Sequence, residues 1–227
     1  MAQAASSLGT LMFVRPESYS SALLSDCLVL CLHRKDIRDY AHLIKDSRMI
    51  ELAFEPGIES EFPRLRSIKH DLFISVGMPL DSHAAERALA LAQTDVDVIH
   101  LYGSGHGCEV GTETPRFTKD VLREVHLKLV DGRVRDRVNL VVSGGIAMAE
   151  HLAKAMICGA DAVAIDTPLL VALECRLCDN CKQGKPCPVK LEDVDPKWGI
   201  QRILNLICAW RLQFIEVMGA CGIREAR

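Results

Sequence analysis

Four cysteines stand within thirteen residues of the chain, in the pattern C-x2-C-x2-C-x5-C-P. They are Cys175, Cys178, Cys181 and Cys187, and Pro188 follows the last of them. Thiolates at this spacing can converge on one inorganic core, which is how proteins hold iron–sulfur clusters. Four cysteines can also bind Zn²⁺, but zinc sites usually pair two separate C-x2-C units. The spacing therefore favours an iron–sulfur cluster, with zinc or redox-regulatory thiols as the alternatives.

The composition indicates a soluble protein of the cytoplasm. A formal net charge of −3 over 227 residues gives no electrostatic footprint for nucleic acid. Ten cysteines are too sparse for a disulfide scaffold and are clustered, which favours a reducing compartment. The apolar stretch at residues 11–14 is too short for a signal peptide, and Asp161, Asp166 and Pro168 interrupt the longer apolar stretch 155–173. We therefore expect no association with a membrane.

Short apolar runs alternate with helical segments along most of the chain. Runs that are apolar on both faces predict buried strands of a parallel sheet covered by helices. The predicted strands cover 27–32, 50–54, 71–76, 96–101, 138–142 and 162–165, with a possible seventh at 10–14. Helices are predicted at 84–93, 119–130, 147–158 and 198–222. Thr118 is expected to cap the second of them, and the last is expected to present one broad apolar face. Between 54 and 71 only a weak helix is expected, because Pro56, Gly57 and Pro63 interrupt it.

This alternation predicts a (β/α)₈ barrel of the TIM-barrel type that is incomplete at its N-terminus. A closed barrel needs eight strands and typically about 250 residues, whereas an open doubly wound sheet would suit the strand count alone. We expect three parts: a partial barrel with a phosphate site at 1–174, a cluster loop at 175–190, and a C-terminal helix packed on the barrel at 191–227. Because open strand edges are normally covered, we also expect an oligomer or a partner chain.

A phosphate-binding turn is predicted where the strand at 138–142 meets the next helix. Two glycines at such a turn let backbone amides approach an anion, and the helix N-terminus favours negative charge. The next strand ends at Asp166 and Thr167, and in phosphate-binding barrels the last two βα loops share the phosphate. These loops together predict a cofactor with a phosphate tail, most simply FMN. The turn consists of Ser143, Gly144, Gly145 and Ile146.

The runs R-D-R-V-N-L-V-V-S-G-G-I and K-A-M-I-C-G-A-D-A-V-A-I-D-T-P-L-L-V-A-L-E-C, with C-P-V farther on, resemble the FMN-binding domain of the glutamate synthase family. The similarity is closest to the short, stand-alone prokaryotic members and covers residues 70–227. It implies a (β/α)₈ barrel that carries FMN, with an iron–sulfur cluster after the last strand.

The resemblance also assigns residues. It matches Cys175, Cys181 and Cys187 to the three cluster ligands of the family, so that Cys178 is an addition that would allow a 4Fe-4S rather than a 3Fe-4S cluster. The FMN phosphate falls to the glycine turn together with Asp166 and Thr167. The family's D-G-G-T-G loop corresponds to residues 103–107. On that loop the candidate cofactor-binding residues are Gly103, Gly105 and His106.

The implied activity is a flavin- and iron–sulfur-dependent reduction of 2-iminoglutarate, made from 2-oxoglutarate and ammonia, to glutamate. Electrons would pass from the cluster to FMN, and a glutaminase or reductase partner subunit is implied. The family's Ser-Val-Lys here reads Ser75-Val76-Gly77, so a lysine near the flavin ring is missing and no catalytic residue is assigned. The alternatives are a methylamine–glutamate ligating relative, a non-catalytic iron–sulfur electron-transfer or assembly subunit, and a phosphosugar-type barrel enzyme with structural zinc.

Several polar residues have a plain structural interpretation. His100 lies inside a predicted strand and is expected to be a hydrogen-bonded core histidine. Asp97 precedes the same strand, where a role at the strand edge is expected. Asp166 can cap the helix that follows it. Cys108 and Cys158 lie apart from the cysteine loop and are expected to be small buried side chains.

Overall fold

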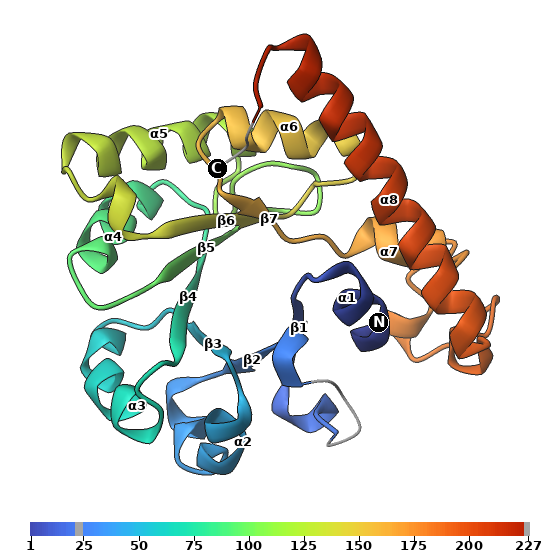
Figure 1. The fold of residues 1–227 in the computed structure, drawn as a ribbon, viewed down its shortest axis with the longest axis horizontal. Coiled ribbons are helices and arrows are strands. Elements are labelled where there is room, and N and C mark those ends of the chain that lie inside the picture. Colours follow the sequence, from blue (N-terminus) through green and yellow to red (C-terminus); the bar gives the residue numbers. More distant parts are fainter. Residues whose placement is uncertain (21–24, 225–227) are drawn as a thin grey trace.

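The computed structural model describes residues 1–20 and 25–224, and its described part contains one parallel sheet with helices on its outer side (Figure 1). The seven strands lie in sequence order, and each pairs in parallel with the next. They are β1 (Met12–Val14), β2 (Leu28–Leu32), β3 (Met49–Ala53), β4 (Phe73–Pro79), β5 (Val98–Tyr102), β6 (Asn139–Ser143) and β7 (Ala162–Val163).

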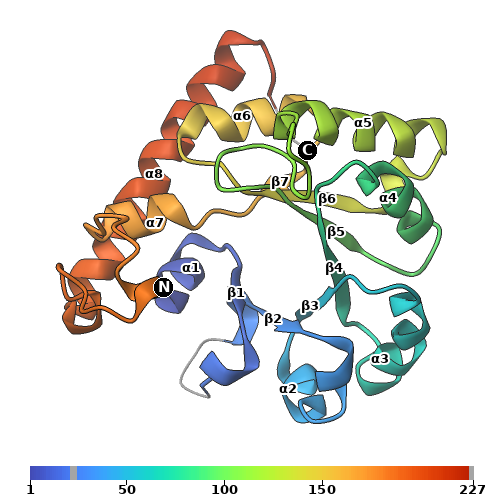
Figure 2. The ribbon, with the colours of Figure 1, turned by 180° about the vertical axis from the view of Figure 1, so that it is seen from behind.

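Helices connect the strands and cover the convex side of the sheet, as the view from behind also shows (Figure 2). Three of them, the helices after β4, β5 and β6, have the bounds that the sequence predicts to within two residues. The helices are α1 (Ala2–Leu8), α2 (Ala41–Asp46), α3 (Phe62–Ile68), α4 (Ala84–Ala92), α5 (Thr118–Asp131), α6 (Ala149–Ile157), α7 (Thr167–Ala172) and α8 (Pro196–Ala220).

The sheet curls into an incomplete (β/α)₈ barrel. Leu28, Leu30 and Leu32 of β2 face the helices in the main core, whereas Val29 between them lies in a second, smaller core inside the curl. Strands that are far apart in the sheet meet inside it, since the ring of Phe13 on β1 lies 5.1 Å from that of His100 on β5. Consecutive strand order also excludes the doubly wound alternative, in which the order reverses at a switch point.

The sequence places the strands well and some helix starts poorly. All predicted strands are present, although β7 is two residues shorter than expected. The expected interruption at Pro63 is wrong, because this proline lies in the first turn of α3, where it costs no hydrogen bond. Thr118 does not cap α5: Phe117 is the N-cap, and the Thr118 hydroxyl is buried without a partner among the described residues.

The last helix, α8, contacts α1, α6 and α7 along one side. Only Gly199 and Ile203 are buried in it, so the predicted broad apolar face is covered only in part, and Leu212 and Ile215 are exposed. By length and composition α8 could span a bilayer, and it is the one such helix in the part of the chain that the structure describes. A single apolar helix is a weak indication of a membrane span, since core helices meet the same criteria.

Aspartates anchor the amino ends of the strands, at the opposite end of the barrel from the predicted phosphate turn. Asp97 accepts hydrogen bonds from the backbone N–H of Ile74 at 2.7 Å and from Nη2 of Arg66 at 2.9 Å. The role at the strand edge that the sequence suggests for Asp97 is therefore confirmed. Contacts at this end of a barrel serve stability rather than chemistry.

Asp161 repeats the arrangement two strands later, and its removal should destabilise the fold. Its Oδ2 accepts from the Leu140 N–H at 2.7 Å and from Nη2 of Arg135 at 2.8 Å. Asp161→Ala leaves both donors without this acceptor, so we expect a loss of about 2 kcal/mol in the free energy of unfolding. Urea denaturation measures it, with the exposed Asp39→Ala as control. A loss no larger than that of the control would contradict the anchoring role.

A histidine beside this anchor predicts a loss of stability on acidification. Burial, and secondly the Arg135 guanidinium, lower the pKa of His126 below its ordinary value. Since the folded pKa lies below the unfolded value of about 6.5, the stability that neutral His126 contributes is complete above pH 6.5 and is lost as the pH falls from that value through the folded pKa. Urea midpoints should therefore fall more steeply between pH 7 and pH 5 in the parent protein than in His126→Gln. Equal slopes would exclude this contribution.

Candidate functional site

The predicted phosphate turn lies at the carboxyl ends of the strands, where barrel enzymes place their sites. Ser143 ends β6 beside Tyr102, the last residue of β5. The Gly103 N–H donates to the Ser143 carbonyl at 2.8 Å, so the loop after β5 begins in direct contact with the turn after β6. The structure thus brings together two of the predicted cofactor-binding segments, 103–107 and 143–146.

Close packing of these two loops explains both glycines of the turn. A Cβ atom on Gly144 would lie 2.3 Å from the Gly103 carbonyl oxygen, and one on Gly145 would lie 2.2 Å from the Gly107 Cα. Both glycines also have positive φ angles, +90° and +72°. Gly105, by contrast, has open space around it and is exposed. The loop contact therefore requires these glycines whether or not an anion binds.

The backbone amides of the turn are nevertheless available to an anion. Within residues 1–20 and 25–224, no hydrogen-bond acceptor is found for the N–H groups of Gly144, Gly145 and Ile146. All three residues are partly or fully buried, and a buried amide without a partner is costly. A phosphate at the start of a helix satisfies such donors. The turn therefore fits the phosphate group of FMN.

The neighbouring loop after β7 contributes in a different way. The Asp166 carboxylate accepts a hydrogen bond from the Thr167 N–H and caps α7, which confirms its structural interpretation. Its charge is thus engaged within the loop. The Thr167 hydroxyl has no partner in the described part of the chain, and it remains the natural donor to an anion from this loop. His106 lies exposed on the loop after β5.

The cysteine loop follows α7 and turns tightly. Leu177 and Asp179 have positive φ angles of 50° and 57°, and the Leu177 N–H points to Sγ of Cys175 at 3.5 Å. The four cysteines are free thiols: Cys175 and Cys187 are partly buried, and the other two are exposed. Among the described residues no three His, Cys, Asp or Glu side chains lie close enough together to hold a metal ion. The thiols suit a cluster chemically, but the cluster stays a prediction.

A polar layer inside the curled sheet was not predicted. The Glu51 carboxylate on β3 accepts from the Ser75 hydroxyl at 3.1 Å, lies 2.8 Å from Nδ1 of His100, and accepts from the Tyr102 hydroxyl. Glu51, Ser75 and His100 are 3%, 0% and 3% exposed. The signal available in the sequence was Glu51 within the apolar run 50–54, because a charged residue is rarely buried in a strand unless it is paired.

The expected hydrogen bonding of His100 is confirmed at one ring nitrogen only. Nδ1 pairs with Glu51, but Nε2 is buried and has no partner within the described residues. Burial, and secondly the Glu51 charge, raise the pKa of Tyr102, so its phenol stays protonated. The same causes raise the pKa of the Cys31 thiol, the neighbour of Glu51 on β2, to about 12.

Gly77 on β4 makes this layer possible. A Cβ atom at Gly77 would lie 2.2 Å from the Tyr102 hydroxyl oxygen, so only glycine lets Tyr102 cross β4 and reach Glu51. This is the position at which the resemblance leads one to expect a lysine. In this chain the space is taken by a tyrosine ring held by a carboxylate.

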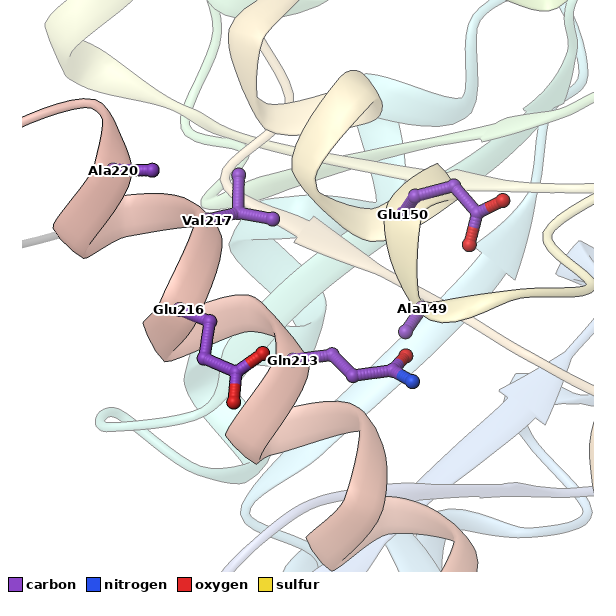
Figure 3. Close-up of a pocket in the computed structure, with 6 residues that line it drawn as sticks. All are labelled: Ala149, Glu150, Gln213, Glu216, Val217 and Ala220. Carbon is purple, nitrogen blue, oxygen red and sulfur yellow. The ribbon is translucent and has the colours of Figure 1, made fainter.

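Two surface hollows lie away from this layer. One, of 430 Å³, lies between α6 and α8, with Glu150 and Glu216 on its two walls (Figure 3). The other, of 620 Å³, follows β2 and β3, and there Glu61 pairs with Arg34 at 2.9 Å and with Arg64 at 3.6 Å. Neither hollow is lined by a residue of the glycine turn or of the cysteine loop.

Comparisons with known proteins agree with the geometry. The conserved region in glutamate synthase matches residues 36–224. An archaeal glutamate synthase [NADPH] of Methanocaldococcus jannaschii is 31% identical over 172 residues, covering 69% of this chain and 33% of the relative. One of Archaeoglobus fulgidus is 30% identical over 192 residues, covering 79% of this chain and 36% of the relative.

The fold has a solved counterpart. A mutant flavocytochrome b2 with pyruvate bound superposes with a TM-score of 0.64 at 16% identity, covering 93% of this chain and 57% of that one. This likeness shows the barrel fold alone. The chain spans about a third of the length of the curated relatives that it matches. Since the conserved region covers most of its residues, the chain belongs to the glutamate synthase family.

Proposed function

We propose that the chain is the FMN-binding part of a glutamate synthase-type oxidoreductase that reduces 2-iminoglutarate to glutamate. The observation that carries this proposal is the half-buried glycine turn, whose three consecutive amides lack acceptors in the described part of the chain. The relatives named glutamate synthase [NADPH] support the reaction class. When bound, FMN would supply hydride-transfer chemistry and a cluster would supply single electrons.

The roles of this chain's own residues follow from their positions. The amides of Gly144, Gly145 and Ile146, with the Thr167 hydroxyl, would hold the phosphate. The loop after the neighbouring strand β5, which carries Gly103, Gly105 and His106, would cover the cofactor. Since this loop packs backbone to backbone on the glycine turn, it would fix the turn before any ligand arrives. A preorganised site loses less entropy on binding.

The cysteine loop would hold an iron–sulfur cluster of the 3Fe-4S or 4Fe-4S type next to the flavin. Cys175, Cys178, Cys181 and Cys187 supply four thiols on one loop that starts directly after α7. Binding would require the loop to draw the four sulfurs together. The relatives' names suggest NADPH as the ultimate reductant, and a glutaminase or reductase partner subunit would supply ammonia or electrons.

One observation favours a second candidate, a non-catalytic electron-transfer or assembly subunit, or a methylamine–glutamate ligating relative. Gly77 and Tyr102 take the space where the resemblance leads one to expect a lysine. A site without that cation would stabilise anionic reduced flavin less. A chain that binds FMN and a cluster but forms no glutamate would meet this alternative.

The phosphate site predicts a strong preference for FMN over riboflavin. Charge-assisted hydrogen bonds contribute about 1.5–3 kcal/mol each, so two of them should make FMN bind about 10²-fold more tightly or better. Ala147→Glu places a negative charge on an exposed residue beside the turn and should weaken FMN binding about tenfold at low salt, whereas Ala147→Gln should not. Fluorescence titration measures both. Equal affinity for riboflavin and FMN would exclude this phosphate site.

The cysteine loop predicts a coloured protein after anaerobic reconstitution with iron and sulfide. Cys181→Ser should abolish the broad visible absorbance, while Cys208→Ser on α8 should leave it unchanged, because Cys208 lies outside the loop. Cys178→Ser should lower the iron content from four to three per chain if Cys178 completes a 4Fe-4S cluster. A colourless protein that holds one equivalent of zinc would contradict the iron–sulfur cluster and support a zinc site instead.

A further inference from the structure

One buried polar atom of the layer inside the curl lacks a hydrogen-bond partner among the described residues. Glu51 receives three donors, from Ser75, His100 and Tyr102, yet Nε2 of His100 has no partner within residues 1–20 and 25–224. His100 is 97% buried, since only 3% of it is exposed. Buried polar atoms are nearly always hydrogen-bonded, and exceptions often mark a functional group. The unpartnered nitrogen therefore points to a ligand or a water.

The ring of His100 is held in one orientation. Glu51 fixes Nδ1 at 2.8 Å, and the rings of Tyr102 and Phe13 lie 4.3 Å and 5.1 Å from it. A carboxylate on one imidazole nitrogen keeps the proton there and leaves the other nitrogen to exchange protons, as in histidine-based acid–base catalysis. The His100 environment has this arrangement.

The titratable groups around the imidazole are few. Glu51 on β3, Tyr102 on β5 and Cys31 on β2 face this space, and the charge of Arg15 slightly opposes the raised pKa of Cys31. In the described part of the chain no lysine or arginine pairs with Glu51. The phenol and the thiol remain protonated near neutral pH because their pKa values are raised. Glu51 and His100 are therefore the pair in this layer through which a proton can be exchanged.

We propose that Glu51, His100 and Tyr102 form an acid–base site inside the curled sheet. Nε2 of His100 would exchange a proton, directly or through one water, with a small substrate at the carboxyl rim, and Glu51 and Tyr102 would position the imidazole. The proposal rests on the proposed function, because reduction of a C=N bond consumes a hydride and a proton. With its Nδ1–H held by Glu51, His100 would first take a proton from water at Nε2 and then pass it to the substrate nitrogen, which returns the imidazole to its neutral form. Bound flavin would supply the hydride to the substrate carbon.

His100→Gln tests the proposal, with the exposed His70→Gln as matched control. General acid–base catalysis is worth about 10²–10⁴-fold, so His100→Gln should lower kcat at least about 10²-fold and leave FMN affinity unchanged. His70→Gln should match the parent protein. Full activity in His100→Gln would overturn the inference while leaving the proposed function intact, whereas failure of the parent protein to bind FMN would overturn the proposed function and, with it, the inference.

A measurement on the apoprotein tests the acid–base inference separately from the proposed function. ¹⁵N spectra of the histidine side chains in the apoprotein should show His100 with its proton on Nδ1 and a free Nε2, and Glu51→Gln should shift both nitrogens. A proton on Nε2 alone in neutral His100 would overturn the inference.

Gly77→Ala tests the positioning role of Tyr102 by pushing its hydroxyl away from Glu51, with Gly219→Ala, which has open space, as control. The raised pKa of Tyr102 should persist in the parent protein and in the control, and it should fall towards the ordinary tyrosine value in Gly77→Ala. The pH profile of kcat should shift with it. An unchanged titration and profile in Gly77→Ala would remove Tyr102 from the site.

Discussion

Parallel pairing of consecutive strands is the constraint on which the rest of the structure depends. Because every strand runs in the same direction, each βα loop emerges at one rim and each αβ connection at the other. The curl then turns one face of the sheet inward, so that Phe13 on β1 meets His100 on β5 although three strands separate them. Loops that carry chemistry are thereby gathered, while the opposite rim is free to serve stability.

The two rims use charged side chains for different purposes. At the amino ends, Asp97 and Asp161 each accept a backbone N–H and an arginine, so their charges are compensated. Inside the curl, Glu51 is held by hydroxyls and an imidazole instead. Burying a carboxylate without a permanent cation costs several kcal/mol, so such a group is retained where a proton or a ligand completes it. This contrast separates the structural carboxylates Asp97 and Asp161 from Glu51, the one proposed to act in catalysis.

Apolar runs were sufficient to predict the strands, because residues on both faces of a covered parallel sheet are buried. The same property prevented the sequence from indicating the polar layer inside the curl. When both faces are apolar, no alternation tells which residues face the helices and which face the curl, so Glu51, Gly77 and Tyr102 could not be assigned to one site. Their association depends on the register between β3, β4 and β5, which is a tertiary property. Short local signals also failed at Pro63 and Thr118, where the loop path decided the helix start.

The glycine turn shows how one sequence motif can have two explanations. Its sequence predicted an anion site, and the structure adds a packing reason, since Gly103 and Gly107 leave no room for side chains at Gly144 and Gly145. Only the amides that lack acceptors among residues 1–20 and 25–224 favour a ligand independently of packing. The cysteine spacing is a comparable case: the pattern specifies the donors, but the positions of the sulfurs around a cluster depend on the cluster itself.

The most direct test of the account follows the backbone amides of the turn in ¹H–¹⁵N spectra while FMN is added. Phosphate binding should shift the amide resonances of Gly144, Gly145 and Ile146 downfield more than any others on the carboxyl rim, and riboflavin should not reproduce these shifts. If FMN binds and these three resonances stay unchanged, the turn is a packing motif and the phosphate lies elsewhere.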